Sequence, residues 1–431
     1  MKKIIALLLV LAMALSLVAC GNSGTTDETK PQAGNNETQP QAGNDTQPVN
    51  AEPEAITLKV WAPQEDQVDA NSWLIQVQKQ FEAAHPEYVI TWDNGVCPEG
   101  DAATMVTADP AAAADVYMFA NDQLGTLLQA GALTKLGGDF LEQVQNEVSA
   151  TYLNTVTSTD GGVYGFPVTP NCWFMYYNKS ILSEEDVKSL EACMEKGIVA
   201  FELKNSWYLP AFFFAAGGSL FGESGIDAAA GVNFGGEVGV NATNAILDLL
   251  ENPNFKVDGD GYGNAGLKDG TVAAYFSGSW DYNGLYEVLG ENLGAVAAPT
   301  VMINGAPAQM KSYFGSKAVG VNPNAKNMKA AMQFAAFLGS AASQQLRFEL
   351  RNITPAATSA AEAAMATSIV AVAEFNTMSY ASAIQPTIAE MNPVWGPVGT
   401  FGTNLADGAV TRDNVQEMVD LLDGQLNNGG L

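Results

Sequence analysis

Residues 115–125 have the sequence Asp115-Val-Tyr-Met-Phe-Ala-Asn-Asp-Gln-Leu-Gly125. Within this stretch, residues 116–120 are apolar without interruption, and polar residues stand on both sides of them. A short apolar run of this composition is typical of a strand. The stretch therefore predicts a strand at 116–120, followed by a loop that contains Asp122.

The residues before this strand alternate between strand and helix patterns. Residues 56–61 and 88–92 have the composition of strands. Between them Trp73, Val77 and Phe81 recur every four residues, which predicts a helix over 73–84 with these side chains on one face. Strand, helix and strand in succession predict an α/β layered domain with a largely parallel sheet.

The chain after residue 125 is long enough for a second domain of ordinary size. Strands are predicted at 173–177 and 316–321, and a pair of strands at 273–277 and 295–298. Helices are expected to dominate from residue 328 onward.

The N-terminus has the composition of a secretory leader. Lys2 and Lys3 precede an apolar run at 4–18, which is shorter than the apolar segment of a typical membrane-spanning helix. The run ends in Leu-Val-Ala-Cys20, which resembles a bacterial lipobox, so residues 1–19 are predicted to be a signal peptide and Cys20 the lipidated first residue. An ordinary cleavage site followed by an unrelated cysteine is the alternative.

Residues 20–54 are predicted to form a disordered tether. They are rich in Asn, Gln, Thr, Gly, Pro and acids, and the sequence Pro-Gln-Ala-Gly-Asn occurs in them twice. Such a segment has almost nothing apolar to bury, so it cannot offset its conformational entropy. A tether on a lipid anchor would hold a folded domain at the outer face of the cell membrane.

Charge and composition narrow the classes of ligand. The net charge is −28, which argues against nucleic acids and anionic ligands and suits a neutral or cationic solute. A single histidine, His85, disfavours Ser-His-Asp catalysis and histidine-rich metal sites. The three cysteines after Cys20 are Cys97, Cys172 and Cys193; one bridge could form, but buried free thiols are favoured.

Several motifs, taken together and in order, resemble the bacterial extracellular sugar-binding proteins typified by maltose-binding protein. They are the 115–125 stretch with 128–133, Val-Tyr-Gly-Phe-Pro at 163–167, Tyr-Asn-Lys at 177–179, Ala-Gly-Gly at 216–218, Lys-Asp-Gly at 268–270 and Ser-Gly-Ser-Trp at 277–280. The resemblance covers nearly the whole chain after the tether.

The resemblance implies an α/β, two-lobe periplasmic-binding-protein fold with a hinge and an interlobe cleft. Lobe 1 would comprise 55–170 and 314–368, and lobe 2 would comprise 171–313 and 369–431. The chain would cross the hinge near 168–173, 311–316 and 366–373. Closure of such lobes around a ligand is a known hinge mechanism. The implied partners are a neutral oligosaccharide and the permease subunits of an importer, with a monomeric protein, no cofactor and no metal.

A cleft for a neutral sugar needs aromatic rings beside amides and carboxylates, since sugars present an apolar C–H face and many hydroxyls. Trp280 and Trp395 match ligand-stacking tryptophans of the family, and both are predicted to lie on loops because Gly, Ser or Pro flank them. Trp207 falls where the family has a stacking tyrosine. For all three the alternative is packing in the core.

Polar residues of the expected cleft are also assigned through the resemblance. Asp122 matches a residue that binds sugar hydroxyls, although it could also cap a helix. Glu65 and Asp66 match a polar pair at the cleft edge, or belong to a solvated loop.

Four positions depart from the family pattern. Phe119 stands in place of Trp, Asn171 and Asn205 in place of Glu, and Gln123 in place of Arg. Because Asn donates as well as accepts hydrogen bonds, the pattern of hydroxyls that is bound would differ.

Other signals are weaker. Residues 258–269 have partial similarity to a calcium loop, but a glycine-rich helix-capping loop is the favoured interpretation.

The first alternative function is that of a secreted glycoside hydrolase, which would also have a tryptophan-lined cleft and would need two carboxylates. A binding protein of the same fold for a polyamine or a peptide is a second alternative. The combined features favour a non-enzymatic binding protein for a malto-oligosaccharide-like ligand.

Overall fold

The computed structural model describes residues 52–427. The predicted signal peptide, Cys20 and all but the last residues of the predicted tether lie outside the described residues. The chain from Glu52 onward packs as one compact unit. Within residues 52–427, no helix has both the length and the apolarity that a membrane crossing requires.

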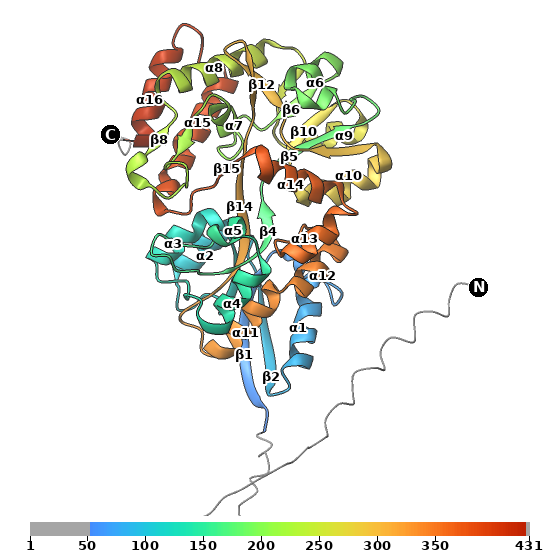
Figure 1. The fold of residues 1–431 in the computed structure, drawn as a ribbon, viewed down its shortest axis with the longest axis vertical. Coiled ribbons are helices and arrows are strands. Elements are labelled where there is room, and N and C mark those ends of the chain that lie inside the picture. Colours follow the sequence, from blue (N-terminus) through green and yellow to red (C-terminus); the bar gives the residue numbers. More distant parts are fainter. Residues whose placement is uncertain (1–51, 428–431) are drawn as a thin grey trace, which may run out of the picture. The chain divides into compact units, whose positions relative to one another are not determined.

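The first sheet has six strands; β1 and β2 lie in the lower half of Figure 1, and β14 extends upward from there to β15. Its strands are β1 (Glu54–Ala62), β2 (Tyr88–Val96), β3 (Val116–Ala120), β4 (Phe166–Asn171), β14 (Ser312–Val321) and β15 (Ser382–Ile384). Strand β1 lies between β2 and β3 and is parallel to both, whereas β14 is antiparallel to β3 and β4. Strand β3 confirms the strand predicted at 116–120, and all five of its residues are buried.

Within residues 52–427, eight helices pack with the first sheet and complete its core. They are α1 (Trp73–Ala84), α2 (Ala102–Ala108), α3 (Leu124–Gln129), α4 (Gly138–Glu147), α5 (Ala150–Asn154), α11 (Met328–Gly339), α12 (Ala341–Arg351) and α13 (Thr358–Met365). Helix α1 has the predicted bounds, and Trp73, Val77 and Phe81 are fully buried in the core. Their spacing of four residues places all three on the same side of the helix.

The second sheet has five strands and lies in the upper half of Figure 1. In spatial order they are β11 (Leu293–Val296), β5 (Phe174–Asn178), β10 (Ala274–Ser277), β6 (Val199–Phe201) and β9 (Phe255–Val257). Two short hairpins accompany this sheet, β7 (Ser219–Leu220) with β8 (Val232–Asn233) and β12 (Thr300–Ile303) with β13 (Ala306–Gln309). The predicted pairing of the strands at 273–277 and 295–298 is wrong. Strands β10 and β11 both pair with β5, on opposite sides of it.

The second sheet has its own helices and a separate large core. The helices are α6 (Leu190–Lys196), α7 (Pro210–Ala215), α8 (Gly236–Glu251), α9 (Tyr262–Asp269), α10 (Tyr282–Leu289), α14 (Ile369–Tyr380), α15 (Trp395–Ala406) and α16 (Val415–Asn427). Phe212, Phe213 and Trp173 are among the fully buried side chains of this core. The first sheet has a different core, built from residues 56–172 and 314–356.

Both sheets are mixed. Strands β1, β2 and β3 are parallel, as predicted, but β14 adds antiparallel pairs to the first sheet. In the first sheet, β14 arrives directly from the other half of the molecule, without the covering helix that would return it parallel to β3. In the second sheet, β5 is antiparallel to both of its neighbours, while β10, β6 and β9 are parallel.

Three segments carry the chain between the two halves. It passes from β4 to β5 after Asn171, and it returns within β14, where Tyr313 belongs to one core and Phe314 to the other. It passes again between α13 and α14, since α13 contacts α12 and α14 contacts β11. The exact lobe boundaries stay a prediction, because residues from Glu52 onward cluster as one unit.

Candidate functional site

Two adjoining chambers lie where elements of the two sheets meet. The larger, here called the tryptophan chamber, has a volume of about 440 Å³. It is lined by Gly100, Ala120, Asp122, Asn171, Ser206, Trp207, Trp280, Lys317, Gln385 and Trp395. Pockets for small ligands have volumes of this order, roughly 300–1,000 Å³.

The smaller chamber, here called the charged chamber, has a volume of about 80 Å³ and is the more enclosed of the two. It is lined by Pro63, Glu65, Glu99, Thr169, Pro170, Ser279, Trp280, Lys317, Arg347, Arg351 and Ile353. Trp280 and Lys317 line both chambers, so the two spaces meet at these side chains.

Trp280 is 45% exposed and lies in the 3-10 turn η6 (Ser279–Asp281), directly after β10. The turn is fixed by Asp281, whose carboxylate accepts hydrogen bonds from the Tyr275 hydroxyl at 2.8 Å and the Ser277 hydroxyl at 2.6 Å. A side chain at Gly278 would collide with the indole, since an added Cβ would lie 2.1 Å from it. Gly278 therefore allows the ring to lie back over the chain and present a face to the chambers.

Trp207 and Trp395 complete the aromatic surface. The Trp207 ring lies 6.1 Å from that of Trp280, and its indole N–H donates to Gln385 Oε1 at 3.2 Å. Trp395 is the first residue of α15 rather than part of a loop, so its predicted loop position is wrong. The flanking residues Pro393 and Gly396 therefore mark the start of a helix. The Trp395 ring is half-buried and still lines the tryptophan chamber.

Asp122 and Asn171 supply polar groups from the first sheet. Asp122 belongs to the 3-10 turn η3 (Asn121–Gln123) at the end of β3, and Asn171 ends β4. Burial raises the pKa of Asp122 to about 6. Both side chains line the tryptophan chamber opposite the tryptophans of the second sheet.

Phe119 does not belong to the site, which corrects the sequence-based assignment. Its side chain is fully buried in the first core. The ring fills space left by two glycines, because a Cβ at Gly165 or Gly320 would come within 3.2 Å and 3.1 Å of it. The sheet is covered on both faces at β3, so neither side of this strand is free for a ligand.

Gln123 and Asn205 lie near the site but line neither chamber. The buried Gln123 amide donates to the Gly100 carbonyl and accepts from the Ala103 N–H at 2.6 Å, so it holds the start of α2. Asn205 is exposed, and its Oδ1 accepts from the Trp207 N–H at 2.9 Å. Asn205 thus positions a chamber residue instead of lining a chamber.

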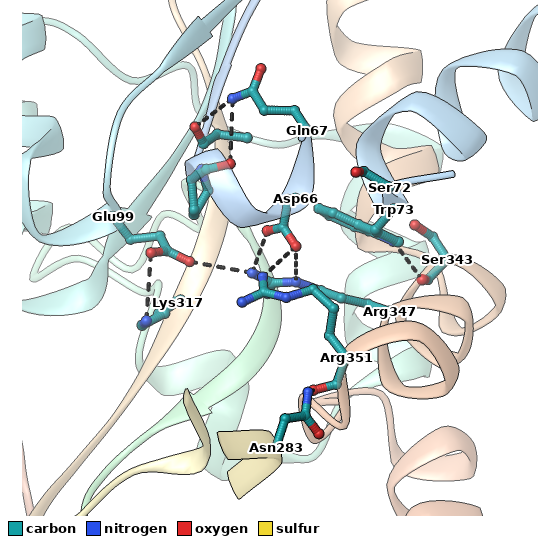
Figure 2. A network of polar contacts seen from close by, with 12 residues as sticks. Asp66, Gln67, Ser72, Trp73, Glu99, Asn283, Lys317, Ser343, Arg347 and Arg351 are labelled. Atoms are coloured by element: carbon teal, nitrogen blue, oxygen red, sulfur yellow. Dashed lines mark hydrogen bonds and ion pairs between the residues drawn. The ribbon is translucent and has the colours of Figure 1, made fainter. Parts of the chain in front are cut away.

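Asp66 and Glu65 are neighbours with different environments. Glu65 is exposed and lines the charged chamber. Asp66 is fully buried, so the predicted polar pair at the cleft edge is wrong for this residue. Its carboxylate accepts hydrogen bonds from Arg347 Nη2 at 2.6 Å and Arg351 Nη1 at 2.5 Å (Figure 2).

A chain of charges extends from Asp66 into the charged chamber. Arg347 also donates to Glu99 Oε1 at 3.4 Å, and Lys317 Nζ lies 3.5 Å from Glu99 Oε2 (Figure 2). Burial alone would raise the pKa of Asp66, but the two guanidiniums hold it below its usual value. Burial alone would also raise the pKa of Glu99, but the positive charges of Lys317 and Arg347 hold that pKa below its usual value.

Lys317, Arg347 and Arg351 were not found by sequence reasoning, although a signal was present. Lys317 is the only charged residue of the otherwise small or apolar strand β14. Such a residue in a buried strand usually has a partner or a function. Arg347 and Arg351 are four residues apart and therefore lie on one face of α12.

The remaining predicted features lie away from the chambers. Cys97, Cys172 and Cys193 are free and buried, as expected. His85 ends α1 and contacts Glu87 at 3.0 Å. Asp258 accepts the N–H groups of Gly259 and Gly263 just before α9, as a capping loop would. Residues 52–427 contain no cluster of three metal-ligating side chains.

Comparison with protein families gives one match over most of the chain. The family described as "Bacterial extracellular solute-binding protein" matches residues 76–374. The galactooligosaccharide-binding protein of Bacillus subtilis (strain 168) is 26% identical over 70% of this chain and 75% of its own length. A maltooligosaccharide ABC transporter solute-binding lipoprotein of Streptococcus pneumoniae serotype 4 is 26% identical over 66% of this chain and 69% of its own.

Solved structures agree with these sequence matches. A protein whose structure was solved with acarbose is 44% identical to this chain and superimposes on it with a TM-score of 0.83. The match covers 87% of this chain and 99% of the other protein's chain. The maltodextrin binding protein MalE1 from L. casei BL23, solved without ligand, has a TM-score of 0.79 at 24% identity over 86% of this chain and 99% of its own. The likeness confirms the predicted α/β periplasmic-binding-protein fold.

Proposed function

This chain belongs to the bacterial extracellular solute-binding protein family, and we propose that it captures an oligosaccharide of the malto-oligosaccharide type for an ATP-binding-cassette importer. The observation that carries the proposal is the tryptophan chamber, in which Trp207, Trp280 and Trp395 converge with Asp122 and Asn171. The family is one of solute-binding proteins, so the expected function is binding without catalysis.

The chemistry of this chamber suits a neutral sugar. An indole face packs well against the C–H face of a pyranose ring, and three indoles offer room for more than one sugar unit. The Asp122 carboxylate accepts hydrogen bonds from hydroxyls, and the Asn171 amide both accepts and donates. Relatives named for galactooligosaccharide and maltooligosaccharide, and a relative solved with acarbose, support a carbohydrate ligand.

The proposed ligand would contact both halves of the molecule. Asp122 and Asn171 come from the first sheet, whereas Trp207 and Trp280 come from elements of the second. A ligand that bridges them has greater affinity for the closed arrangement and therefore shifts the protein toward it. The three crossing segments, after Asn171, within β14 and between α13 and α14, would act as the hinge.

The remaining partners also belong to the proposal. Cys20 would carry the lipid that anchors the protein to the extracytoplasmic face of the membrane, and a permease would receive the ligand from a monomer. A solute-binding lipoprotein among the relatives supports the anchor.

The composition of the chamber disfavours the alternatives. A retaining or inverting glycosidase needs two carboxylates across the scissile bond, and a polyamine site needs several acids. Among the residues that line the tryptophan chamber, Asp122 is the one carboxylate within the part of the chain that the structure describes.

The test is calorimetry with maltohexaose, a galacto-oligosaccharide and spermidine, each followed by product analysis. We expect maltohexaose to bind in the micromolar range or tighter and to be recovered intact. Binding of spermidine alone would contradict the proposal, and so would release of reducing ends beyond the amount of protein.

A further inference from the structure

A further cavity lies beside β14, the strand that returns the chain from one half to the other. This space, here called the rear cavity, has a volume of about 290 Å³. It is lined by Thr151, Asn154, Thr155, Thr157, Ser158, Ser224, Ile226, Phe314, Ile384, Gln385 and Thr387. Its volume is at the lower limit of pockets for small ligands, roughly 300–1,000 Å³, so it suits one molecule of about the size of a hexose.

The rear cavity and the tryptophan chamber lie on opposite faces of β14. Successive side chains of a strand point to opposite faces. Phe314 lines the rear cavity, and Ser316, two residues on, shares a hydrogen bond of 2.5 Å with the Thr155 hydroxyl of its wall. Lys317 lines the tryptophan chamber on the other face, as does Asn171, the partner of β14 at position 315. The rear cavity is therefore a different space from the proposed sugar cleft.

Both halves of the molecule build the walls of the rear cavity. Residues 151–158 come from α5 and the segment after it, in the first half. Ser224 and Ile226 come from the loop between β7 and β8, in the second half. Because β14 is one of the crossing segments and lies between the two spaces, a hinge rotation that narrows the cleft widens the rear cavity. The width of this cavity therefore depends on how far the protein is closed.

The lining of the rear cavity is polar but uncharged. Hydroxyl and amide side chains predominate, beside the apolar groups of Ile226, Phe314 and Ile384. None of the lining residues that the structure describes carries a charge, although the whole chain has a net charge of −28. A charged guest would lose hydration here without gaining an ionic partner, so the cavity favours a neutral molecule.

Several of these polar groups are not used by the protein. Within residues 52–427, the side chains of Asn154, Ser158 and Ser224 form no hydrogen bond with another residue. The Thr157 hydroxyl donates to the Leu153 carbonyl at 2.8 Å, which fixes the hydroxyl and leaves its oxygen able to accept. Amide and hydroxyl groups both donate and accept hydrogen bonds, so they match a guest that carries several hydroxyls.

Gln385 connects the rear cavity with the tryptophan chamber, since it lines both. Its main-chain N–H donates to the Phe314 carbonyl at 2.8 Å, and its carbonyl accepts from the Asn121 amide at 3.3 Å. Its side-chain Oε1 accepts from the Trp207 indole N–H at 3.2 Å. A change in the width of the rear cavity therefore acts on a residue that holds one of the three tryptophans.

We infer that the rear cavity is a second binding site, which takes one small neutral polyol of about hexose size and stabilises the closed arrangement. The coupling to closure rests on the proposed function. An occupant holds the walls of the two halves apart on the rear face of β14, and thereby opposes opening of the cleft on the other face. Because linkage is reciprocal, the polyol and the oligosaccharide raise each other's affinity by the same factor.

The first experiment measures maltohexaose binding by calorimetry on the full folded protein at increasing concentrations of myo-inositol. We expect saturating myo-inositol to tighten maltohexaose binding by at least about fivefold, which is the lower limit of typical coupling between sites. Myo-inositol should bind the maltohexaose-saturated protein more tightly than the free protein by the same factor. The charged analogues gluconate and glucosamine are the controls for neutrality, and an equal effect of either would contradict an uncharged site.

Two variants test whether the effect arises in the rear cavity. Ser224→Phe places a ring at an exposed loop position of the wall, so the ring takes the place of the guest. It should tighten maltohexaose binding by about fivefold without myo-inositol and abolish the response to myo-inositol. Thr157→Val removes one hydroxyl at nearly constant shape and should weaken myo-inositol binding by about 10-fold. Ser379→Phe, at an exposed position of α14 that lines none of the cavities described, is the matched control.

The outcomes separate this site from the proposed function. If maltohexaose binds with the same affinity at every concentration of myo-inositol, the proposed function stands and the rear site is overturned. Weaker maltohexaose binding would show competition in the tryptophan chamber, which also overturns it. If maltohexaose does not bind at all, the proposed function fails, and saturable binding of myo-inositol alone that Ser224→Phe abolishes would still support the rear site. If Ser224→Phe does not fold, an unchanged response of Thr157→Val to myo-inositol overturns the site.

Discussion

Removal of the Trp280 ring should weaken ligand binding and leave the unliganded fold almost unchanged. The side chain is 45% exposed in the described structure. A tryptophan offers roughly 250 Å² in all, so about 110 Å² of this ring is available to a ligand. At about 25 cal/mol per Å², complete coverage of that area contributes about 2.8 kcal/mol.

A sugar that stacks on one face would cover most but not all of this area. Trp280→Ala should therefore reduce the free energy of binding by about 2 kcal/mol, which is a loss of about 30-fold in affinity. In the unliganded protein the variant loses the contact with Lys317 at 5.6 Å and the ring contact with Trp207 at 6.1 Å. Together these partly exposed contacts are worth about 1–2.5 kcal/mol, so the melting temperature should fall by no more than about 5 °C.

The assay is calorimetry with maltohexaose together with thermal melting of the unliganded protein. Phe375→Ala is the matched control, because Phe375 is 46% exposed on α14 and lines neither chamber. The control should keep the parental affinity. A Trp280→Ala protein that melts much earlier but binds maltohexaose normally would refute the reasoning and make Trp280 a packing residue.

Four further predictions concern buried charges and the anchor. Burial raises the pKa of Glu374 from 4.5 to about 7, so the folded state loses stability as the pH rises through that window. Glu374→Gln should then stabilise the protein by about 3 kcal/mol at pH 8 and little at pH 4.5 in denaturant titrations; equal effects at both pH values would contradict this. Burial also raises the pKa of Asp122 to about 6. If the ionised form binds hydroxyls, affinity at pH 5 should be about 10-fold weaker than at pH 7.5, and Asp122→Asn should abolish that pH dependence in calorimetry. Arg347→Met leaves the buried Asp66 with a single guanidinium partner, that of Arg351, and should lower the free energy of unfolding by about 3–5 kcal/mol. An unchanged denaturation midpoint would show that the Asp66–Arg347 ion pair is not needed for stability. Cys20→Ala should move the protein from the membrane fraction to the soluble fraction with unchanged affinity, and retention in the membrane fraction would argue against lipidation.

Local pattern was sufficient to predict α1 and β3, and the family resemblance implied part of the site. The four-residue spacing of Trp73, Val77 and Phe81 defined α1, and the apolar run at 116–120 defined β3, because burial of one helix face or of a whole strand leaves a periodic trace in the sequence. Trp207, Trp280, Trp395, Asp122 and Asn171 were assigned through family motifs and converge on one chamber.

Tertiary structure decided which of several polar or aromatic residues face that chamber. Phe119 and Asp122 are three residues apart, yet one fills the core beside two glycines and the other lines the chamber. Sequence cannot distinguish them, since the direction of each side chain depends on how β3 is covered on both faces by distant elements. The same holds for Asp66, whose partner Arg347 lies far along the chain.

The α/β elements follow from the periodicity of the sequence, whereas the aromatic and amide residues of the cleft were implied by the family resemblance of its motifs. Only the tertiary structure decided that β14 runs antiparallel through the first sheet and carries Lys317 to the face of Trp280. Only it decided that Arg347 pairs with Asp66 and Glu99 beside the charged chamber. Both partners of Arg347 lie more than two hundred positions away along the chain, where desolvation and pairing of charges, rather than local pattern, fix the geometry.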